Sequence, residues 1–142
     1  MKITKDALAA MIDHSLLRPQ STREELKKLC AEAVAHGFKA VCVNPVHVAD
    51  AALLLKGEAP LVCSVVGFPF GTHTRSAKAA ETAEVIRLGA GEVDMVLRIG
   101  ALKEGRDDEV EADIAAVVHA AAGFPVKVII ETDSLNREQI IE

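Results

Sequence analysis

The 142-residue sequence contains no tryptophan, no tyrosine and only four phenylalanines, although half of its residues are hydrophobic. Its core must therefore be built from Ala, Val, Ile and Leu. Small branched side chains at this density suit helices packed against a buried parallel sheet. The length fits one sizeable core, so we predict a single domain over residues 1–142.

Cysteine is also scarce, and its three residues all lie in apolar segments: Cys30, Cys42 and Cys63. This pattern predicts reduced core thiols in a cytoplasmic protein. The net charge of -5 gives no electrostatic reason to expect nucleic acid as a partner. No apolar run approaches the roughly 20 residues that cross a membrane. Acids also interrupt the first segment, where a signal peptide would be apolar. We therefore expect a soluble protein without membrane partners.

The sequence lacks the motifs of several common enzyme classes. The segment VGFPFGTHT is not followed by Gly-Lys-Ser/Thr, so it predicts a tight turn before a helix rather than a phosphate-binding loop. No dinucleotide-binding G-x-G-x-x-G and no hydrolase G-x-S-x-G occurs. Four of the five histidines are scattered without metal-ligand spacing, so we expect no metal site and no cofactor.

Helix-like and strand-like segments alternate along the chain. We predict helices near residues 4–10, 21–36, 46–57, 74–88, 107–121 and from 134 onward, and strands within 11–17, 40–45, 60–71, 92–97 and 126–132. A glycine separates helix from strand at Gly37, Gly89 and Gly123. This alternation predicts an α/β protein of βαβ units with a parallel sheet.

A carboxylate, Asp94, stands among apolar residues in GAGEVDMVL. Burying it costs several kcal/mol unless it is paired, solvated or at the end of its strand. Parallel sheets place their chemistry at the carboxyl ends of the strands. Polar residues are predicted at or near those ends: Asp13, His14, Cys42, Asn44, Asp94, Lys127, Glu131 and Thr132. Any one of these is more often structural, but several on one sheet predict a site.

Lys127 lies in the apolar segment VKVII, where an ammonium group is costly to bury. A desolvated lysine beside another cation can become a nucleophile. It can equally well pair with an acid such as Asp94 or Glu131. The sequence leaves both roles open.

Several segments together resemble the 2-deoxyribose-5-phosphate aldolase family, in the same order and at similar spacing. They are IDHSLLRP, GFKAVCVNP, VVGFPFGTHT, GAGEVDMVLRIGALKEG and VKVIIET, and they cover nearly the whole chain. The resemblance implies a (β/α)8 TIM barrel and a cytoplasmic class I lyase. Its reaction would be reversible cleavage of 2-deoxy-D-ribose 5-phosphate to acetaldehyde and D-glyceraldehyde 3-phosphate. The family uses a lysine Schiff base and no metal.

The resemblance also implies roles for individual residues. Asp94 matches the aspartate that relays protons near the Schiff base, and Lys127 matches a lysine that lines the site. The expected substrate-binding residues come from the first two strand segments: Asp13, His14, Cys42 and Asn44. Ser15 stands where threonine is common, which keeps the hydroxyl group.

The sequence departs from the family in length. The Schiff-base lysine of the family lies on strand six in a KTSTG-like motif, and this sequence ends at Glu142 before such a motif. The lysine of strand seven and the phosphate loops after strands seven and eight are missing too. We therefore expect an amino-terminal part of about five βα units, inactive unless complemented. The alternative is a non-catalytic, self-associating α/β module.

An incomplete barrel would leave the edges of its first and fifth strands unpaired. Unpaired edges and exposed apolar surface favour association between chains. We therefore expect a homodimer or a higher oligomer through the exposed barrel edges.

Overall fold

The computed structural model describes residues 3–141 and contains one five-stranded sheet. The strands follow the order of the sequence: β1 (Asp13–Leu16), β2 (Ala40–Val43), β3 (Leu61–Val66), β4 (Glu92–Val96) and β5 (Val126–Ile129). The pairings of β1 with β2, β2 with β3 and β4 with β5 are parallel, and helices alternate with the strands along the chain. The predicted α/β class with a parallel sheet of about five βα units is confirmed.

The helices occupy most of the predicted segments. They are α1 (Lys5–Ala9), α2 (Arg23–His36), α3 (Val48–Leu54), α4 (Arg75–Arg87), α5 (Ile99–Lys103), α6 (Asp107–Ala120) and α7 (Arg137–Ile141), with 3-10 turns η1 (Pro45–His47) and η2 (Thr132–Ser134). The short α5 and both 3-10 turns were not predicted. Among residues 3–141, every helix is too short or too polar to cross a bilayer.

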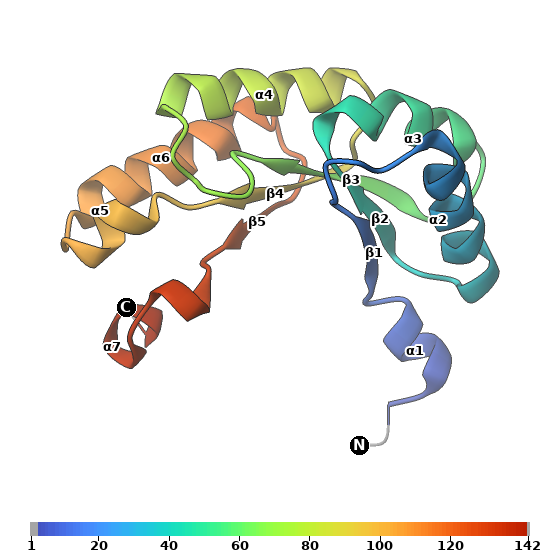
Figure 1. Cartoon of the computed structure of the whole chain (residues 1–142), viewed down its shortest axis with the longest axis horizontal. Coiled ribbons are helices and arrows are strands. Elements are labelled where there is room, and N and C mark those ends of the chain that lie inside the picture. Colours follow the sequence, from blue (N-terminus) through green and yellow to red (C-terminus); the bar gives the residue numbers. More distant parts are fainter. Residues whose placement is uncertain (1–2, 142) are drawn as a thin grey trace. The chain divides into compact units, whose positions relative to one another are not determined.

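The described residues divide into two compact units. The first contains residues 3–64 and Val85–Glu92, and therefore α1, α2, α3, β1 and β2. Figure 1 shows α2 beside β1 and β2, and contacts between these elements join them. In the parallel register, Cys42 lies opposite Ser15 of β1 and Cys63 of β3.

Local sequence signals explain both ends of α2. The Thr22 hydroxyl accepts a hydrogen bond from the backbone N–H of Glu25, and the Glu25 carboxylate accepts one from the backbone N–H of Thr22. This reciprocal cap satisfies two N–H groups that the helix itself cannot use. At the other end Gly37 adopts a left-handed conformation with φ 65°, which glycine tolerates without strain.

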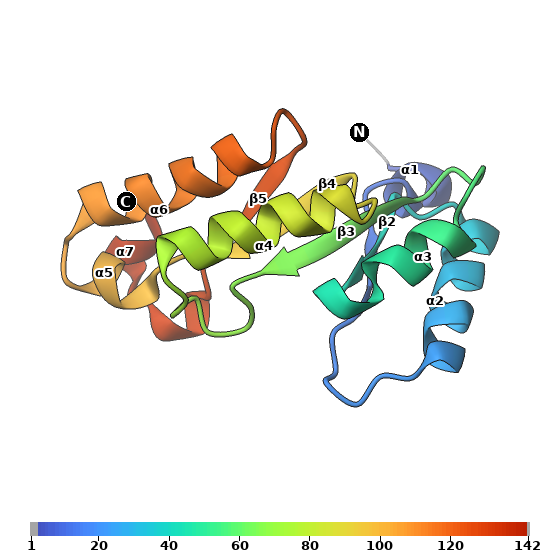
Figure 2. The same ribbon diagram turned by 90° about the horizontal axis from the view of Figure 1, so that it is seen from above.

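The second unit contains Val65–Glu84 and residues 93–141. Here α6 packs against β5 and α5, and Figure 2 shows α6 running beside α4. In β4, the neighbours Val93, Met95 and Val96 are fully buried, whereas Asp94 is only partly buried. Asp94 lies opposite Lys127 in the register of β4 with β5.

The segment between β3 and α4 forms the tight turn that its sequence predicts. The Gly71 N–H donates to the Gly67 carbonyl at 2.8 Å, and both glycines have positive φ. A side chain at Gly71 would collide with the backbone oxygen of Leu97. This glycine is therefore required because the turn lies directly against the segment that follows β4.

Candidate active site

Asp94 and Lys127 face each other from neighbouring strands of the second unit. The Asp94 carboxylate oxygen Oδ1 lies 3.1 Å from Lys127 Nζ. The side chains are 17% and 41% exposed, so water reaches part of each, whereas the Asp94 Oδ1 atom itself is buried. Of the two acids considered as partners for Lys127, the structure pairs it with Asp94.

This contact explains how the apolar strand β4 tolerates the carboxylate of Asp94. Asp94 is the one residue of β4 that is not fully buried, and a cation neutralises its charge. A carboxylate held in place beside an ammonium group and open to water is equipped to accept and release protons. The pair is therefore the strongest candidate for chemistry in the second unit.

Asp13 lies at the opposite end of its strand from the one expected. It is the first residue of β1, and its carboxylate lies within 4.8 Å of Cys63 Sγ and of the carboxylate of Glu92, the first residue of β4. Lys39 Nζ contacts the two carboxylate oxygens of Glu92 at 2.9 and 3.2 Å. These thiol and carboxylate groups could in principle ligate a metal, but the Lys39 cation already balances Glu92.

His14 points toward α2. Its Nε2 lies 2.8 Å from the Glu32 carboxylate on α2, and its ring lies 5.2 Å from that of Phe38. Successive side chains of a strand face opposite sides, so His14 and Asp13 cannot share a face. The hydrogen bond from His14 lowers the pKa of Glu32, so this pair serves the packing of α2 on β1.

The two remaining predicted residues lie at the carboxyl end of β2. Cys42 is 2% exposed and lies within the strand, beside Cys63 of β3. Asn44 follows the strand, and its side-chain amide donates to the Leu17 carbonyl at 3.1 Å. Asn44 therefore joins the loops after β1 and β2.

Sequence reasoning missed a buried ion pair in the second unit. Lys78 of α4 is fully buried, and its Nζ lies 2.5 Å from the carboxylate of Asp113 on α6. A signal was available, because Lys78, Thr82 and Val85 are spaced four and three residues apart. This spacing places all three on one face of a helix, and all three are fully buried.

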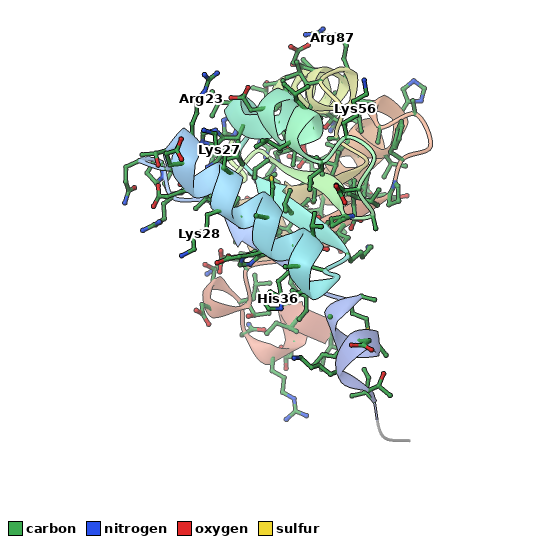
Figure 3. All side chains as sticks on the ribbon, turned by 90° about the vertical axis from the view of Figure 1, so that its right-hand side faces the viewer. Arg23, Lys27, Lys28, His36, Lys56 and Arg87 are labelled. Atoms are coloured by element: carbon green, nitrogen blue, oxygen red, sulfur yellow. The ribbon has the colours of Figure 1, made fainter. Side chains whose placement is uncertain are left out.

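Basic side chains lie on the outer face of the first unit. Figure 3 labels Arg23, Lys27, Lys28, His36, Lys56 and Arg87 there. Three of them pair with acids: Arg23 with Asp50 at 3.1 Å, Lys27 with Glu24 at 2.6 Å, and Lys28 with Glu32 at 3.8 Å. This face therefore carries mixed charge, and exposed pairs of this kind contribute little to stability.

An apolar groove of about 630 Å³ lies in the second unit between α6, β5 and α7. Its walls include Val118, Val128, Ile130 and Ile140. Val128 follows Lys127 in the strand, so the groove opens on the face opposite the Asp94–Lys127 pair. It is therefore separate from the candidate chemistry.

Comparisons with known proteins agree on one family. The model of the DeoC/LacD family aldolases matches residues 7–140. Deoxyribose-phosphate aldolase 2 of Staphylococcus aureus (strain MRSA252) is 53% identical over 134 residues, which cover 94% of this chain and 61% of that protein. Deoxyribose-phosphate aldolase 1 of the Mu50 strain is 53% identical over 131 residues, covering 92% of this chain and 60% of that protein.

Solved structures show the same relationship. A Coccidioides immitis protein assigned as a deoxyribose-phosphate aldolase superimposes with a TM-score of 0.94 at 38% identity, over 97% of this chain and 55% of its own. The tetrameric deoxyribose phosphate aldolase of Aeropyrum pernix gives 0.82 at 29% identity, over 96% and 58%. The chain thus spans about three fifths of the length of the curated relatives it matches.

Proposed function

Because this chain belongs to the DeoC/LacD aldolase family, we propose that it forms the amino-terminal part of a deoxyribose-phosphate aldolase. The proposed reaction is the reversible cleavage of 2-deoxy-D-ribose 5-phosphate to acetaldehyde and D-glyceraldehyde 3-phosphate. The observation that carries the proposal is the contact of 3.1 Å between Asp94 and Lys127. It brings together the two residues to which the family resemblance assigns catalytic positions.

The reaction needs a nucleophile and a group that moves protons. A lysine amine adds to the substrate aldehyde and water leaves, which gives an iminium ion. Removal of the proton from the 3-hydroxyl turns C3 into the carbonyl carbon of D-glyceraldehyde 3-phosphate, which leaves as the C2–C3 bond breaks. The electron pair of that bond forms an enamine. Protonation of the enamine and hydrolysis by water release acetaldehyde and the free amine.

We assign the proton transfers to Asp94, directly or through a bound water. Its carboxylate is partly exposed and close to a cation, so it can exchange protons with substrate or water. Lys127 keeps this carboxylate oriented and adds positive charge beside the reacting atoms. Asp13, His14, Cys42 and Asn44 of the first unit remain the substrate-binding residues that the family resemblance implies.

The first test asks whether Lys127 is itself the nucleophile. The chain would be incubated with deoxyribose 5-phosphate and borohydride, which reduces an iminium to a stable adduct. Its mass would then be measured by mass spectrometry. We expect an unchanged mass and no significant turnover, because the proposal places the Schiff-base lysine outside these residues. A stoichiometric adduct on Lys127 would make that residue the nucleophile and contradict the assignment.

The second test restores the rest of the barrel. Residues 1–142 would be joined to the remaining carboxyl-terminal part of the S. aureus relative, and retro-aldol turnover measured. We expect activity in this fusion, a loss of about a hundredfold or more in Asp94→Asn, and no loss in Asp108→Asn, which alters an exposed acid on α6. A folded but inactive fusion would favour the alternative, a non-catalytic self-associating module.

We also propose a cytoplasmic location and a sugar phosphate as the small-molecule partner. The location is supported by the burial of all three cysteine side chains, Cys30, Cys42 and Cys63. The tetramer of the A. pernix relative supports an oligomer. Fractionation of cells followed by detection of the protein tests the location.

A further inference from the structure

The buried ammonium group of Lys78 holds three elements of the second unit together. Its side chain has no exposed surface, although it comes from the surface helix α4. Nζ donates to the Asp113 carboxylate on α6 at 2.5 Å and to the backbone carbonyl of Val96 at 2.8 Å. Val96 is the last residue of β4. The cation therefore fixes the carboxyl end of the strand that carries Asp94.

The stem of the same lysine supports the end of β3. Gly67 follows β3 with a positive φ, and a Cβ there would lie 2.9 Å from Cε of Lys78. One helical turn further along α4, the Glu81 carboxylate accepts a hydrogen bond from the Gly67 N–H at 2.8 Å. Residues of α4 thus hold the point at which β3 ends as well as the end of β4.

Packing alone does not require this arrangement. Replacing a buried ion pair by apolar residues of similar volume is often neutral or stabilising, and the side chains of this pair are only 0% and 3% exposed. What apolar residues cannot supply is a donor for the Val96 carbonyl. Asp94 precedes Val96 by two residues and shares its face of the strand. A shift of the strand end therefore displaces the carboxylate that contacts Lys127.

We propose that Lys78 is a positioning residue for the candidate active site, acting through the Val96 carbonyl to hold Asp94 against Lys127. Asp113 balances the charge of the buried ammonium group. The importance of the pair for catalysis rests on the proposed function. The geometric claim does not, because it can be measured in the 142-residue chain without any substrate.

The test follows the NMR signals of the Lys127 side chain, the ε-carbon and ζ-nitrogen, in isotopically labelled protein. The Asp94→Asn variant gives the reference chemical shifts of these signals when the contact between Asp94 and Lys127 is lost. In Lys78→Met combined with Asp113→Leu, which replaces the ion pair by apolar groups, we expect the signals to move toward that position. The matched control is Thr82→Val, because the Thr82 hydroxyl is equally buried on α4 and donates only within it, to the Lys78 carbonyl. Its Lys127 signals should stay in place.

Asp113→Asn separates positioning from stability. This variant weakens the ion pair but retains the donor at the Val96 carbonyl, so resistance to urea should fall while the Lys127 signals stay. If the double variant does not fold, Lys78→Gln with Asp113→Asn replaces it. In that variant polar groups remain between α4 and α6, but the glutamine side chain is shorter than lysine and does not reach the Val96 carbonyl. The Lys127 signals should therefore move. Unchanged signals in a folded variant that lacks the donor, or moved signals in Asp113→Asn, would overturn the proposal.

In the fusion with the carboxyl-terminal part of the S. aureus relative, Lys78→Met combined with Asp113→Leu should lower kcat by about tenfold to a hundredfold. KM should stay nearly unchanged, because misplacement of reacting groups by about 1 Å reduces the rate by that much. An equal loss in kcat and in substrate binding would contradict a positioning role. If the unaltered fusion has no activity at all, the proposed function fails. The NMR result then still decides whether Lys78 positions Asp94.

Discussion

Water reaches both side chains of the Asp94–Lys127 pair, and this exposure determines what the pair contributes to stability. Such pairs are screened by solvent, so Asp94→Asn should lower the free energy of unfolding by about 1 kcal/mol or less. Urea denaturation of the 142-residue chain measures the change, with Asp108→Asn as an exposed control. A loss of several kcal/mol would mean that the pair is structural and inaccessible to substrate.

The contact between Lys39 and Glu92 in the first unit should behave differently. The Glu92 side chain is only 1% exposed, whereas that of Lys39 is 42% exposed. Lys39→Met leaves a buried carboxylate without its cation and should cost about 2 kcal/mol of unfolding free energy, less than for a fully buried pair. Thermal and urea unfolding check this value.

The double variant Lys39→Met with Glu92→Leu provides the control for that prediction. Removing both charges leaves no uncompensated carboxylate, so this variant should recover most of the lost stability. If it were less stable than Lys39→Met, the contacts that Glu92 makes in addition to Lys39 would dominate.

At the scale of one element, the amino-terminal cap of α2 predicts a pH dependence. The backbone hydrogen bond from Thr22 is the largest cause that lowers the pKa of Glu25 from its usual 4.5. A carboxyl group whose folded pKa is depressed stabilises the folded state above about pH 4.5, and this contribution is lost as the pH falls through the folded pKa.

The Glu25→Gln variant tests this sign. It should be less stable than the wild type at neutral pH, and the difference should shrink as the pH falls below 4.5. Urea denaturation at a series of pH values gives the comparison. A difference that stayed constant with pH would show that ionised Glu25 does not act through the cap.

The sequence predicts most elements because their signals are local. Gly37 ends α2, and the cap at Thr22 begins it. All four residues of β2 are buried, and its sequence is accordingly a continuous apolar run. The five-residue α5 is not predicted from the sequence, because a helix that short is stabilised by packing against α6 rather than by local signals. The start of β1 at Asp13 is likewise set by pairing with β2.

The candidate site is predictable only in part for the same reason. Asp94 and Lys127 stand out because a charge within an apolar strand is costly. The orientation of His14 depends on which face of a short strand meets α2, and its sequence does not specify that. Lys78 and Asp113 lie on helices, where charged residues usually face water. The spacing of Lys78 with Thr82 and Val85 indicates its burial, but the pairing with Asp113 depends on how α4 and α6 pack.

At the scale of the whole chain, the sheet has two outer strands. Among residues 3–141, β1 pairs only with β2, and β5 pairs only with β4. Edge strands attract further strands unless charge or covering elements protect them. Beside β5, the apolar groove leaves Val118, Ile130 and Ile140 36% to 50% exposed. Burying a few hundred Å² of such surface is worth on the order of 10 kcal/mol at about 25 cal/mol per Å².

We therefore expect the 142-residue chain to associate in a concentration-dependent manner, as a homodimer or a larger oligomer through its outer strands. Multi-angle light scattering across the micromolar range should give an apparent mass above 15.1 kDa that rises with concentration.

Ile130→Lys, which places a charge directly after β5, should weaken association because edge charges oppose strand pairing. Arg137→Glu, which alters a residue of α7 that lies outside the walls of the groove, is the control. A monomer at every concentration with cooperative unfolding would refute this expectation, since it would show that neither the edges nor the groove recruits a second copy.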